Sequence, residues 1–297
     1  MAMGKRARRE AIEFYAFISP WLFGFICFTL GPILYSLYLS FTKWEILTPP
    51  QFVGIANYLK AFTDDPRFWV TLKNTVYYTF VAIPFGMFFS IVLAMLMSRM
   101  VRGISIFRML IYLPAVSSGV AATILWIMLI SNQGLINQAL GLIGIHGPSW
   151  LYDVRWTMPS LIMMNLWSGV GGGMVIYLAG LQGIPGHLLE AATIDGARWF
   201  QKTRYITLPL LTPVIFLNLI MSIIGSFQIF TQSFFLQGAM PPPIRDSVLT
   251  YSLYIYQNAF EFFKMGYASA LSWILFLIVF ILTITQFKVS NRWVYYD

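Results

Sequence analysis

Six long apolar runs constrain what this chain can fold into more than any other feature of its sequence. Of its 19 basic and 11 acidic residues, only Arg108 lies within a run, at the edge of the third. A helix rises about 1.5 Å per residue, so each run is long enough to cross a hydrocarbon core about 30 Å thick. The sequence therefore predicts six transmembrane helices, at residues 14–41, 74–97, 107–130, 157–180, 210–236 and 268–287.

The composition supports this fold class over its alternatives. The chain is 58% hydrophobic and only 10% charged, whereas a soluble domain has about 25% charged residues. A transmembrane barrel requires alternating strands of about ten residues, but these runs are apolar on every side. The first run is longer than the apolar region of a signal peptide, and no small-residue cleavage site follows it. We therefore expect an all-α membrane protein whose residues 1–297 form a single transmembrane domain.

The distribution of basic residues predicts which segments face the cytoplasm. With the N-terminus inside, the inner segments hold 12 Lys and Arg residues and the outer segments hold 7. Basic residues accumulate on the cytoplasmic side of membrane proteins, so the count favours an N-in and C-in topology. These residues lie in short connections beside the runs, where topology and anionic lipid account for them. A nucleic-acid partner is therefore not expected, in spite of the formal net charge of +8.

Two outer connections are long enough to contain structure of their own. In residues 42–73 we expect a short helix at 56–62, which the Asp-Asp-Pro sequence after it ends. In residues 131–156 we expect an amphipathic stretch at 134–142 to lie along the outer surface. Both segments therefore predict short helices outside the membrane.

The connection between the fourth and fifth runs is the polar exception in an apolar chain. Residues 181–208 form a segment of 28 residues on the predicted cytoplasmic side, whereas helices in a bundle are usually joined by about 2 to 8 residues. Its C-terminal part, 190–209, has the sequence EAATIDGARWFQKTRYITLP and gathers five charged residues. A connection of this length and polarity predicts a function beyond joining two helices.

The residues of this connection predict two short helices joined by a bend. Pro185 suits a first helical turn, and the HLLEAATI sequence that follows contains good helix formers. Gly196 can adopt the left-handed conformation that ends a helix, and the carboxylate of Asp195 can cap the next helix, ARWFQKTRYI. Pro209 pushes Leu208 out of helical geometry and is expected to end that second helix. The residues alone leave two interpretations open, an amphipathic elbow resting on lipid headgroups and a docking site for a partner protein.

The same segment resembles the EAA loop of binding-protein-dependent ABC importer permeases. The pattern of that family is Glu-Ala-Ala, two residues, Asp-Gly-Ala and, further on, an Ile-x-Leu-Pro ending. The matching residues here are Glu190, Ala191, Ala192, Asp195, Gly196 and Ala197, followed by Ile206, Thr207, Leu208 and Pro209. The resemblance implies that the first six form the coupling helix seated on an ATP-hydrolysing subunit. It also implies that Glu190 lies at the contact and that Gly196 supplies the bend.

The resemblance further implies an architecture and a set of partners. The implied architecture is the type I ABC importer permease fold, in the cytoplasmic (inner) membrane of a bacterium or an archaeon. The phosphate-binding sequence GxxxxGK[ST] is absent from the chain. We therefore expect a non-catalytic chain without a cofactor or metal of its own, and two separate ATP-binding subunits that hold ATP and Mg²⁺. The other implied partners are a second homologous permease subunit, an extracytoplasmic solute-binding protein and membrane lipid.

Two further stretches resemble the carbohydrate-uptake branch of that family, near the large permease subunit of maltose-type and glycerol-phosphate-type systems. They are FVGIANYLKAFTDDPRFWVTLKNT at 52–75 and NAFEFFKMGYASALSWILF at 258–276. The resemblance implies an importer of sugars or oligosaccharides. The alternatives are similar importers for glycerol-phosphate, polyamines, amino acids or phosphate, and an ion-coupled secondary transporter. The last would predict ionisable residues in the membrane and broken helices, and the sequence indicates neither.

Polar residues in the fourth and fifth runs are the candidates for a substrate pathway. Aromatic faces, amides and hydroxyls bind sugars, and such polar groups are costly in lipid but not in a cavity. The related maltose permease binds sugar from its equivalent fourth and fifth helices. A competing interpretation remains for the glycines, because a Gly169-x-x-x-Gly173 spacing is more often a face of close helix packing. The candidates are Asn165, Trp167, Gly169, Gln228, Thr231 and Gln232.

Overall fold

The computed structural model describes residues 5–98 and 103–295. Arg99 and Arg102, two of the basic residues in the predicted inner connection after the second run, lie outside the described residues. The N-in and C-in topology, which rests partly on these two residues, stays a prediction.

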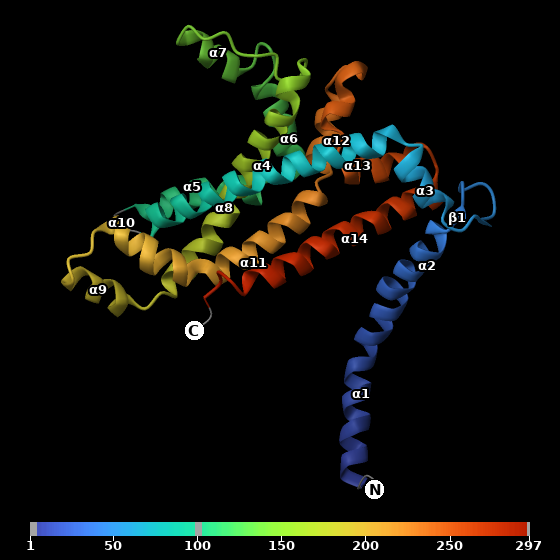
Figure 1. Cartoon of the computed structure of the whole chain (residues 1–297), viewed down its shortest axis with the longest axis horizontal. Coiled ribbons are helices and arrows are strands. Elements are labelled where there is room, and N and C mark those ends of the chain that lie inside the picture. Colours follow the sequence, from blue (N-terminus) through green and yellow to red (C-terminus); the bar gives the residue numbers. More distant parts are fainter. Residues whose placement is uncertain (1–4, 99–102, 296–297) are drawn as a thin grey trace. The chain divides into compact units, whose positions relative to one another are not determined.

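The chain divides into two compact units. The first comprises residues 1–64 and 255–274, and the second comprises residues 65–254 and 275–297. Figure 1 shows the order of their elements along the chain. The prediction of one transmembrane domain over residues 1–297 is neither supported nor contradicted by this division.

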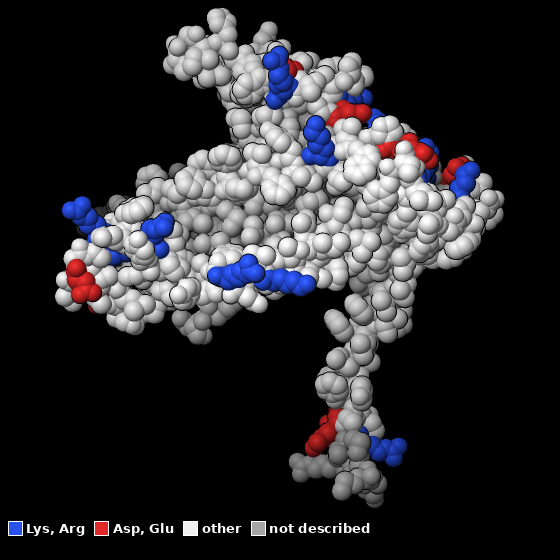
Figure 2. Space-filling model, viewed as in Figure 1, with Lys and Arg blue, Asp and Glu red and all other residues white. Residues whose placement is uncertain are grey.

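The first unit begins with one long helix. It consists of α1 (Lys5–Phe25), a π-helical turn η1 (Ile26–Leu30) and α2 (Gly31–Ser40), and it contains the first apolar run. Its apolar side chains are mostly exposed, Phe17 by 88%, as expected of a helix that is surrounded by lipid. Figure 2 shows its charged side chains gathered at the N-terminal end. The first predicted transmembrane helix is therefore confirmed as a candidate span of 33 residues, Arg8–Ser40.

A short hairpin and a short helix follow this span. β1 (Thr42–Lys43) pairs antiparallel with β2 (Gln51–Phe52). α3 (Ala56–Thr63) then confirms the helix predicted at 56–62. The remaining elements of the first unit are the C-terminal part of α13 (Tyr251–Tyr256), a π-helical turn η4 (Gln257–Glu261) and the first turns of α14 (Met265–Ser290).

Close contacts join these pieces of the first unit. The side-chain amide of Asn57 donates to the carbonyl oxygens of Ser40 and Thr42, at 2.9 and 2.8 Å. A Cβ atom added at Gly266, at the start of α14, would overlap the carbonyl oxygen of Thr42. The backbone N–H of Gly266 also donates to the carbonyl oxygen of Trp44, at 3.3 Å. The end of the first span, α3 and the start of α14 therefore pack as one piece.

The second unit contains long helices joined by shorter ones. Before the predicted cytoplasmic connection lie α4 (Pro66–Met97), α5 (Ile104–Val116), α6 (Gly119–Leu129), α7 (Leu135–Leu142) and α8 (Val154–Gln182). The connection contains α9 (Gly186–Ile194), α10 (Trp199–Lys202) and the π-helical turn η2 (Thr203–Thr207). After it come α11 (Leu208–Phe227), α12 (Thr231–Gly238), the short helix η3 (Pro242–Val248) and the C-terminal part of α14. α7 confirms the helix predicted at 134–142.

Aspartate side chains start two of the long helices in this unit. The carboxylate of Asp65 accepts the backbone N–H groups of Arg67 and Phe68, at 3.0 and 3.3 Å, where α4 begins. The carboxylate of Asp153 accepts the backbone N–H of Arg155, at 3.0 Å, where α8 begins. Such N-cap bonds satisfy donors that lack a partner within the helix, and each is worth about 1 kcal/mol. Both helices therefore begin before the apolar runs that they contain.

Glycines on α8 allow its neighbours to pack closely against it. A Cβ atom added at Gly171 would overlap a backbone carbonyl oxygen of α5, and one added at Gly173 would lie 2.5 Å from Oγ of Ser90 on α4. A Cβ atom added at Gly180 would lie 2.8 Å from the side chain of Leu211 on α11. α8 is therefore the helix around which α4, α5 and α11 of the second unit are arranged.

Two of the predicted spans are interrupted. The third run contains α5 and α6, which are bent by 99° relative to each other. The fifth run contains α11 and α12, which residues 228–230 separate. If the bent pair is counted as one span, the described residues contain six candidate spans, as predicted.

The expectation that the spans would be unbroken is therefore wrong. The backbone at Ser117 is extended, with φ −73° and ψ 151°, directly after a last helical turn that contains Pro114. Irregular backbone is tolerated at membrane depth where it is buried in protein or lines a cavity. The two breaks therefore indicate that these parts of the spans are buried in protein or line an internal cavity.

Candidate functional site

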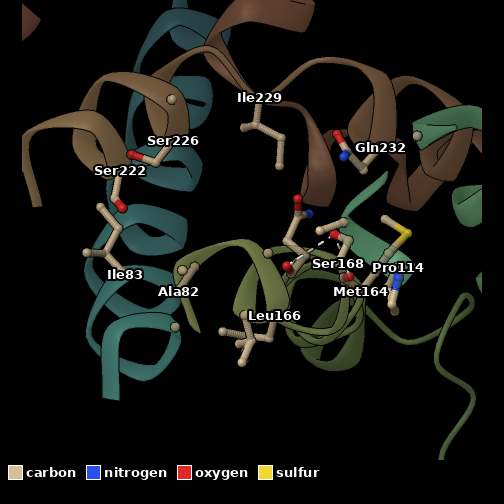
Figure 3. A pocket seen from close by; sticks show the side chains of 18 of the residues that line it. Ala82, Ile83, Pro114, Met164, Leu166, Ser168, Ser222, Ser226, Ile229 and Gln232 are labelled. Carbon is tan, nitrogen blue, oxygen red and sulfur yellow. Dashed lines mark hydrogen bonds between the residues drawn. The ribbon is translucent and has the colours of Figure 1, made fainter. Parts of the chain in front are cut away.

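A cavity of about 670 Å³ lies in the second unit. It is lined by α4, by α8 and by the two interrupted spans, α5 with α6 and α11 with α12. Figure 3 shows Ile229 and Gln232 at this cavity, on the part of the chain where α11 gives way to α12, opposite Ser168 of α8. Pro114, from the end of α5, lines the cavity as well. The two helix breaks therefore line the same internal space.

Most of the predicted pathway residues line this cavity, but Trp167 does not. The Trp167 ring packs edge-on against Trp126 of α6, with ring centroids 5.9 Å apart and the rings inclined at 71°. A helix turns by about 100° per residue, so a side chain two positions after Asn165 points to nearly the opposite face. The predicted residues that the structure brings together are Asn165, Gly169, Gln228, Thr231 and Gln232.

The amide side chains at the cavity keep hydrogen-bonding capacity for a bound solute. Nδ2 of Asn165 donates to the carbonyl oxygen of Leu161, at 2.9 Å. The side chains of Gln228 and Gln232 make no hydrogen bond to any residue within 5–98 and 103–295. Gln228 is exposed and Gln232 is half-buried, so both side chains can exchange water for a bound solute. These two glutamines therefore suit contact with a polar solute.

Two polar residues on a second face of the cavity, Asn218 and Ser222, were missed in the sequence. Asn218 and Ser222 lie one turn apart on α11, and Oγ of Ser222 is 3.1 Å from Oδ1 of Asn218. Ser226, one turn further on, shares a hydrogen bond of 2.9 Å with Thr79 of α4. The spacing of four residues was the available signal, because it places all three polar residues on one face of an otherwise apolar helix.

The lining combines polar and apolar side chains, and its described residues are uncharged. Among the described residues, no Lys, Arg, His, Asp or Glu side chain lines the cavity. Amides and hydroxyls donate and accept hydrogen bonds, and the apolar side chains between them can cover C–H surfaces. The chemistry that this lining offers is therefore the binding of a solute rich in hydroxyl groups.

The two glycines of the predicted packing spacing differ in their surroundings. A Cβ atom added at Gly169 has no heavy atom within 4 Å, and Gly169 lines the cavity. Gly173 lines the cavity too, but it contacts Ser90 closely, as described for the fold. The packing interpretation therefore fits Gly173, and the pathway interpretation fits Gly169.

We expect Gly171→Ala to lower the thermal stability of the protein and Gly169→Ala to leave it nearly unchanged. The added methyl group at Gly171 overlaps a backbone carbonyl, and overpacking of this kind costs about 1 to 3 kcal/mol. The methyl group at Gly169 enters open space. Thermal unfolding of the two variants in the same detergent measures the difference, and equal melting temperatures would contradict the close packing of α5 on α8.

The polar connection folds into two short helices around Gly196, as predicted. α9 ends at Ile194, and Gly196 has a φ of +77°. The N–H of Ala197 donates to the carbonyl of Ala192 at 2.9 Å, and the N–H of Gly196 donates to that of Thr193 at 3.1 Å. This pair of bonds is a Schellman motif, in which a left-handed residue satisfies the last carbonyls of a helix. The predicted bend is therefore confirmed.

The predicted cap of the second helix is wrong. Asp195 is the C-cap of α9, and α10 begins at Trp199 with Arg198 as its N-cap. The N–H of Arg198 donates to Oε1 of Gln201, at 2.7 Å. An N-cap residue directly precedes the first helical residue, and the Schellman turn places Asp195 several residues too early. The cap that is present is the other bond of a capping box, in which the side chain at N3 accepts the N–H of the N-cap residue.

The predicted end of the second helix is also wrong. Leu208 keeps helical angles, with φ −65° and ψ −44°, and η2 connects α10 to α11 without interruption. The N–H of Leu208 donates to the carbonyl of Thr203, five residues earlier. A π-helical turn is wider than an α-helical turn, so it can accommodate the ring of Pro209, which has no N–H to donate. The chain therefore runs as helix from the connection into the fifth span.

The surface of this connection combines exposed apolar and charged side chains. Glu190 is exposed, and Nζ of Lys202 donates to Oγ1 of Thr193 at 3.1 Å, which links α10 to α9. Large apolar side chains in contact with solvent indicate a site of protein or membrane interaction. The most exposed are Ile194 (87%), Tyr205 (70%), Phe200 (67%) and Trp199 (60%).

Comparison with known proteins decides the family. The sequence pattern of the family described as binding-protein-dependent transport system inner membrane component matches residues 72–294. The chain belongs to this family. It is 40% identical over 299 residues to the probable ABC transporter permease protein YesP of Bacillus subtilis (strain 168), with 100% of this chain and 96% of that protein covered. The permease is also 36% identical over 296 residues to the lactose transport system permease protein LacF of Rhizobium radiobacter, with 96% and 98% covered.

A solved structure confirms the fold. The permease superposes on a chain in the crystal structure of a bacterial ABC transporter involved in the import of the acidic polysaccharide alginate. The TM-score is 0.84 at 23% identity, with 97% of this chain and 98% of that chain covered. The predicted family and the all-α fold of an ABC importer permease are therefore confirmed. The permease is a multi-pass inner membrane component of a binding-protein-dependent transport system.

Proposed function

We propose that this permease forms half of the translocation pathway of an ATP-driven importer of sugars or oligosaccharides. The observation that carries the proposal is the cavity in the second unit, with its amides, hydroxyls and uncharged lining. A saccharide presents many hydroxyl groups and apolar C–H surfaces, and such a lining can bind both. The similarity to a permease of a lactose transport system supports the same class of substrate.

We assign the coupling to ATP hydrolysis to the segment 190–209. Its exposed Glu190 and its exposed apolar side chains support this role. The Schellman bonds at Gly196 and the bond from Lys202 to Thr193 fix α9 against α10. Because helix continues from α10 through η2 into α11, a displacement of α9 would reach a helix that lines the cavity. This continuity supplies a mechanical route from the ATPase contact to the solute.

The function requires partners that supply chemistry this chain does not. We expect ATP and Mg²⁺ to be bound by two ATP-binding subunits, and the permease to be non-catalytic. A second homologous permease would form the other half of the pathway. An extracytoplasmic solute-binding protein would deliver the saccharide, in keeping with the binding-protein-dependent family.

Stimulation of ATP hydrolysis tests this proposal. The complete complex in nanodiscs would be mixed with its binding protein, loaded with a panel of saccharides or with glycerol-phosphate, amino acids or polyamines. We expect a saccharide-loaded binding protein to raise ATP hydrolysis several-fold. Stimulation only by a non-saccharide ligand would show that the substrate class is wrong, whereas the role as an importer permease would stand.

The double variant Gln228→Ala and Gln232→Ala should weaken solute recognition. Each lost hydrogen bond costs about 0.5 to 1.5 kcal/mol, so the substrate concentration for half-maximal transport should rise about tenfold. Uptake of labelled saccharide at several concentrations measures this. Gln51→Ala is the matched control, because this exposed glutamine of β2 lines no part of the cavity. If the double variant reached half-maximal transport at the wild-type substrate concentration, the two glutamines would not contact the solute.

A further inference from the structure

A second cavity, of about 210 Å³, lies in the first unit, formed by β1 and the residues after it, by α3 and by the start of α14. It is large enough for a phosphate group together with part of the group attached to it. The charged side chains that line it are Lys43, Lys60, Lys264 and Glu45.

The three lysines of this cavity are not neutralised by the protein itself. None of them, and not Glu45 either, forms an ion pair with any residue that the structure describes. Nζ of Lys60 lies 4.9 Å from the ring centroid of Tyr267, and Nζ of Lys264 lies 5.7 Å from that of Phe262. Contacts with an aromatic face leave ammonium N–H groups to donate to an anion. The four charged side chains therefore give the cavity a net positive charge. The lysine ammonium groups keep N–H groups that can donate hydrogen bonds to an anion.

The backbone holds the walls of this cavity in place. Glu45 and Lys264 are joined by a backbone bridge, and the N–H of Lys264 donates to the carbonyl oxygen of Asn258 at 2.7 Å. Phe263, directly before Lys264, has a φ of +55°, a left-handed conformation that is uncommon for a residue other than glycine. Such conformations persist only where the surrounding structure enforces them. The backbone around Lys264 is therefore held in place, whereas the exposed side chains of Lys43, Glu45, Lys60 and Lys264 can adjust to a ligand.

The position of the cavity along the chain indicates which anion it meets. Lys43 lies three residues beyond the end of α2, and Lys264 directly precedes α14, so both lie at the ends of apolar spans. Trp44 and Tyr267 also line the cavity, and tryptophan and tyrosine accumulate at the level of lipid headgroups. The outer segment 42–73 holds four basic residues, as many as the N-terminal segment that is predicted to lie inside. The positive-inside rule does not explain this accumulation.

We propose that this cavity binds the phosphate group of an anionic phospholipid of the phosphatidylglycerol class, in the predicted outer leaflet. Lysine ammonium groups bind phosphate as point charges with several donors. The headgroup phosphate of a phospholipid lies at the level of the span ends, where this cavity opens among aromatic side chains. Free phosphate shares the chemistry, but the location at the membrane interface assigns the site to lipid.

Retention of lipid by the purified complex tests the proposal. The complex would be extracted from vesicles of equal phosphatidylglycerol and phosphatidylcholine, and the retained lipids would be quantified by mass spectrometry. A lysine near an anionic membrane surface contributes a factor of about five. The triple variant K43Q/K60Q/K264Q should therefore retain at least about tenfold less phosphatidylglycerol, with phosphatidylcholine unchanged.

Lys73→Gln is the matched control, because this exposed lysine of the same outer segment does not line the cavity. Equal retention of phosphatidylglycerol by the triple variant and the wild type would overturn the proposal.

Two further measurements keep the test decisive. If the triple variant does not assemble, Lys264→Gln and Glu45→Gln should change the retention of phosphatidylglycerol in opposite directions, down and up. A decrease in both variants would indicate damage to the fold and would overturn the assignment of an anion site. Inorganic phosphate added to the lipid-loaded wild-type complex should not displace phosphatidylglycerol. Displacement at low millimolar phosphate would overturn lipid as the occupant in favour of free phosphate.

Discussion

Replacing Gly196 with valine should abolish binding-protein-stimulated ATP hydrolysis and transport, while the permease still inserts into the membrane. Gly196 has a φ of +77°, where a residue with a Cβ atom costs about 1 to 2 kcal/mol and a β-branched residue costs more. The left-handed turn forms the Schellman motif that sets the angle between α9 and α10. Without it, the exposed face of α9 would lose the orientation toward the ATPase that we propose for it. We expect stimulated hydrolysis to fall to the basal rate, several-fold below that of the wild type.

Two glycine-site variants separate the effect of the bend from that of mutation as such. Gly196→Asn should keep most of the coupling, because asparagine tolerates the left-handed conformation. Gly186→Ala should behave as wild type, because this glycine of α9 has no positive φ and an added Cβ atom meets nothing within 4 Å. The amount of permease in the membrane fraction checks insertion. If stimulated ATP hydrolysis by the valine variant equalled that of the wild type, this bend would have no role in coupling.

Gly169→Trp should block transport by filling the cavity. A Cβ atom at Gly169 meets no heavy atom within 4 Å, so an indole can extend into the space of about 670 Å³ that the solute would occupy. We expect saccharide uptake to fall at least about tenfold, since the substituted side chain competes with the solute for the same volume. The coupling connection is unaltered, so the variant should still assemble with its ATPase subunits.

The matched variant Gly169→Ala should transport at the wild-type rate, because a methyl group leaves the cavity open. Uptake of labelled saccharide into proteoliposomes compares the two variants, and co-purification of the ATPase subunits checks assembly. Equal uptake by the tryptophan and alanine variants would show that the solute passes elsewhere.

The features that were predictable from the sequence depend on residues close together in the chain. The apolar runs reflect the free energy of transferring each residue into lipid, which needs no knowledge of the fold. The bend at Gly196 follows from the conformational freedom of one glycine between helix formers. The family resemblance was likewise predictable, because all of its motif residues lie within the segment 190–209.

The break between α11 and α12 depends on contacts that the sequence does not reveal. At the end of α11, Oγ1 of Thr250 donates to the carbonyl oxygen of Ile229 at 2.9 Å, and Oγ of Ser252 donates to that of Phe227 at 3.0 Å. These hydroxyls satisfy carbonyls that the interrupted helix leaves free, from positions more than twenty residues along the chain. Residues 228–230 contain no glycine or proline. No local signal therefore marked this break.

The remaining errors come from geometry within helices. Trp167 was grouped with Asn165 by composition, although its position two residues later turns it toward Trp126. Pro209 was expected to end a helix, although a π-helical turn before it allows the helix to continue. For Trp167 the prediction ignored the rotation of the helix from one residue to the next. For Pro209 it ignored that a π-helical turn is wider than an α-helical turn. The continuity through Pro209 matters most for function, because it joins the coupling segment to the wall of the cavity.

Saccharide uptake by proteoliposomes tests most directly whether the cavity and the segment 190–209 serve one ATP-driven import cycle. The vesicles would contain the permease, its partner permease and the ATPase subunits, with the binding protein outside and ATP inside. We expect uptake that requires both ATP and the binding protein, and that fails with Gly196→Val. Uptake driven by an ion gradient in vesicles without ATP would contradict this expectation.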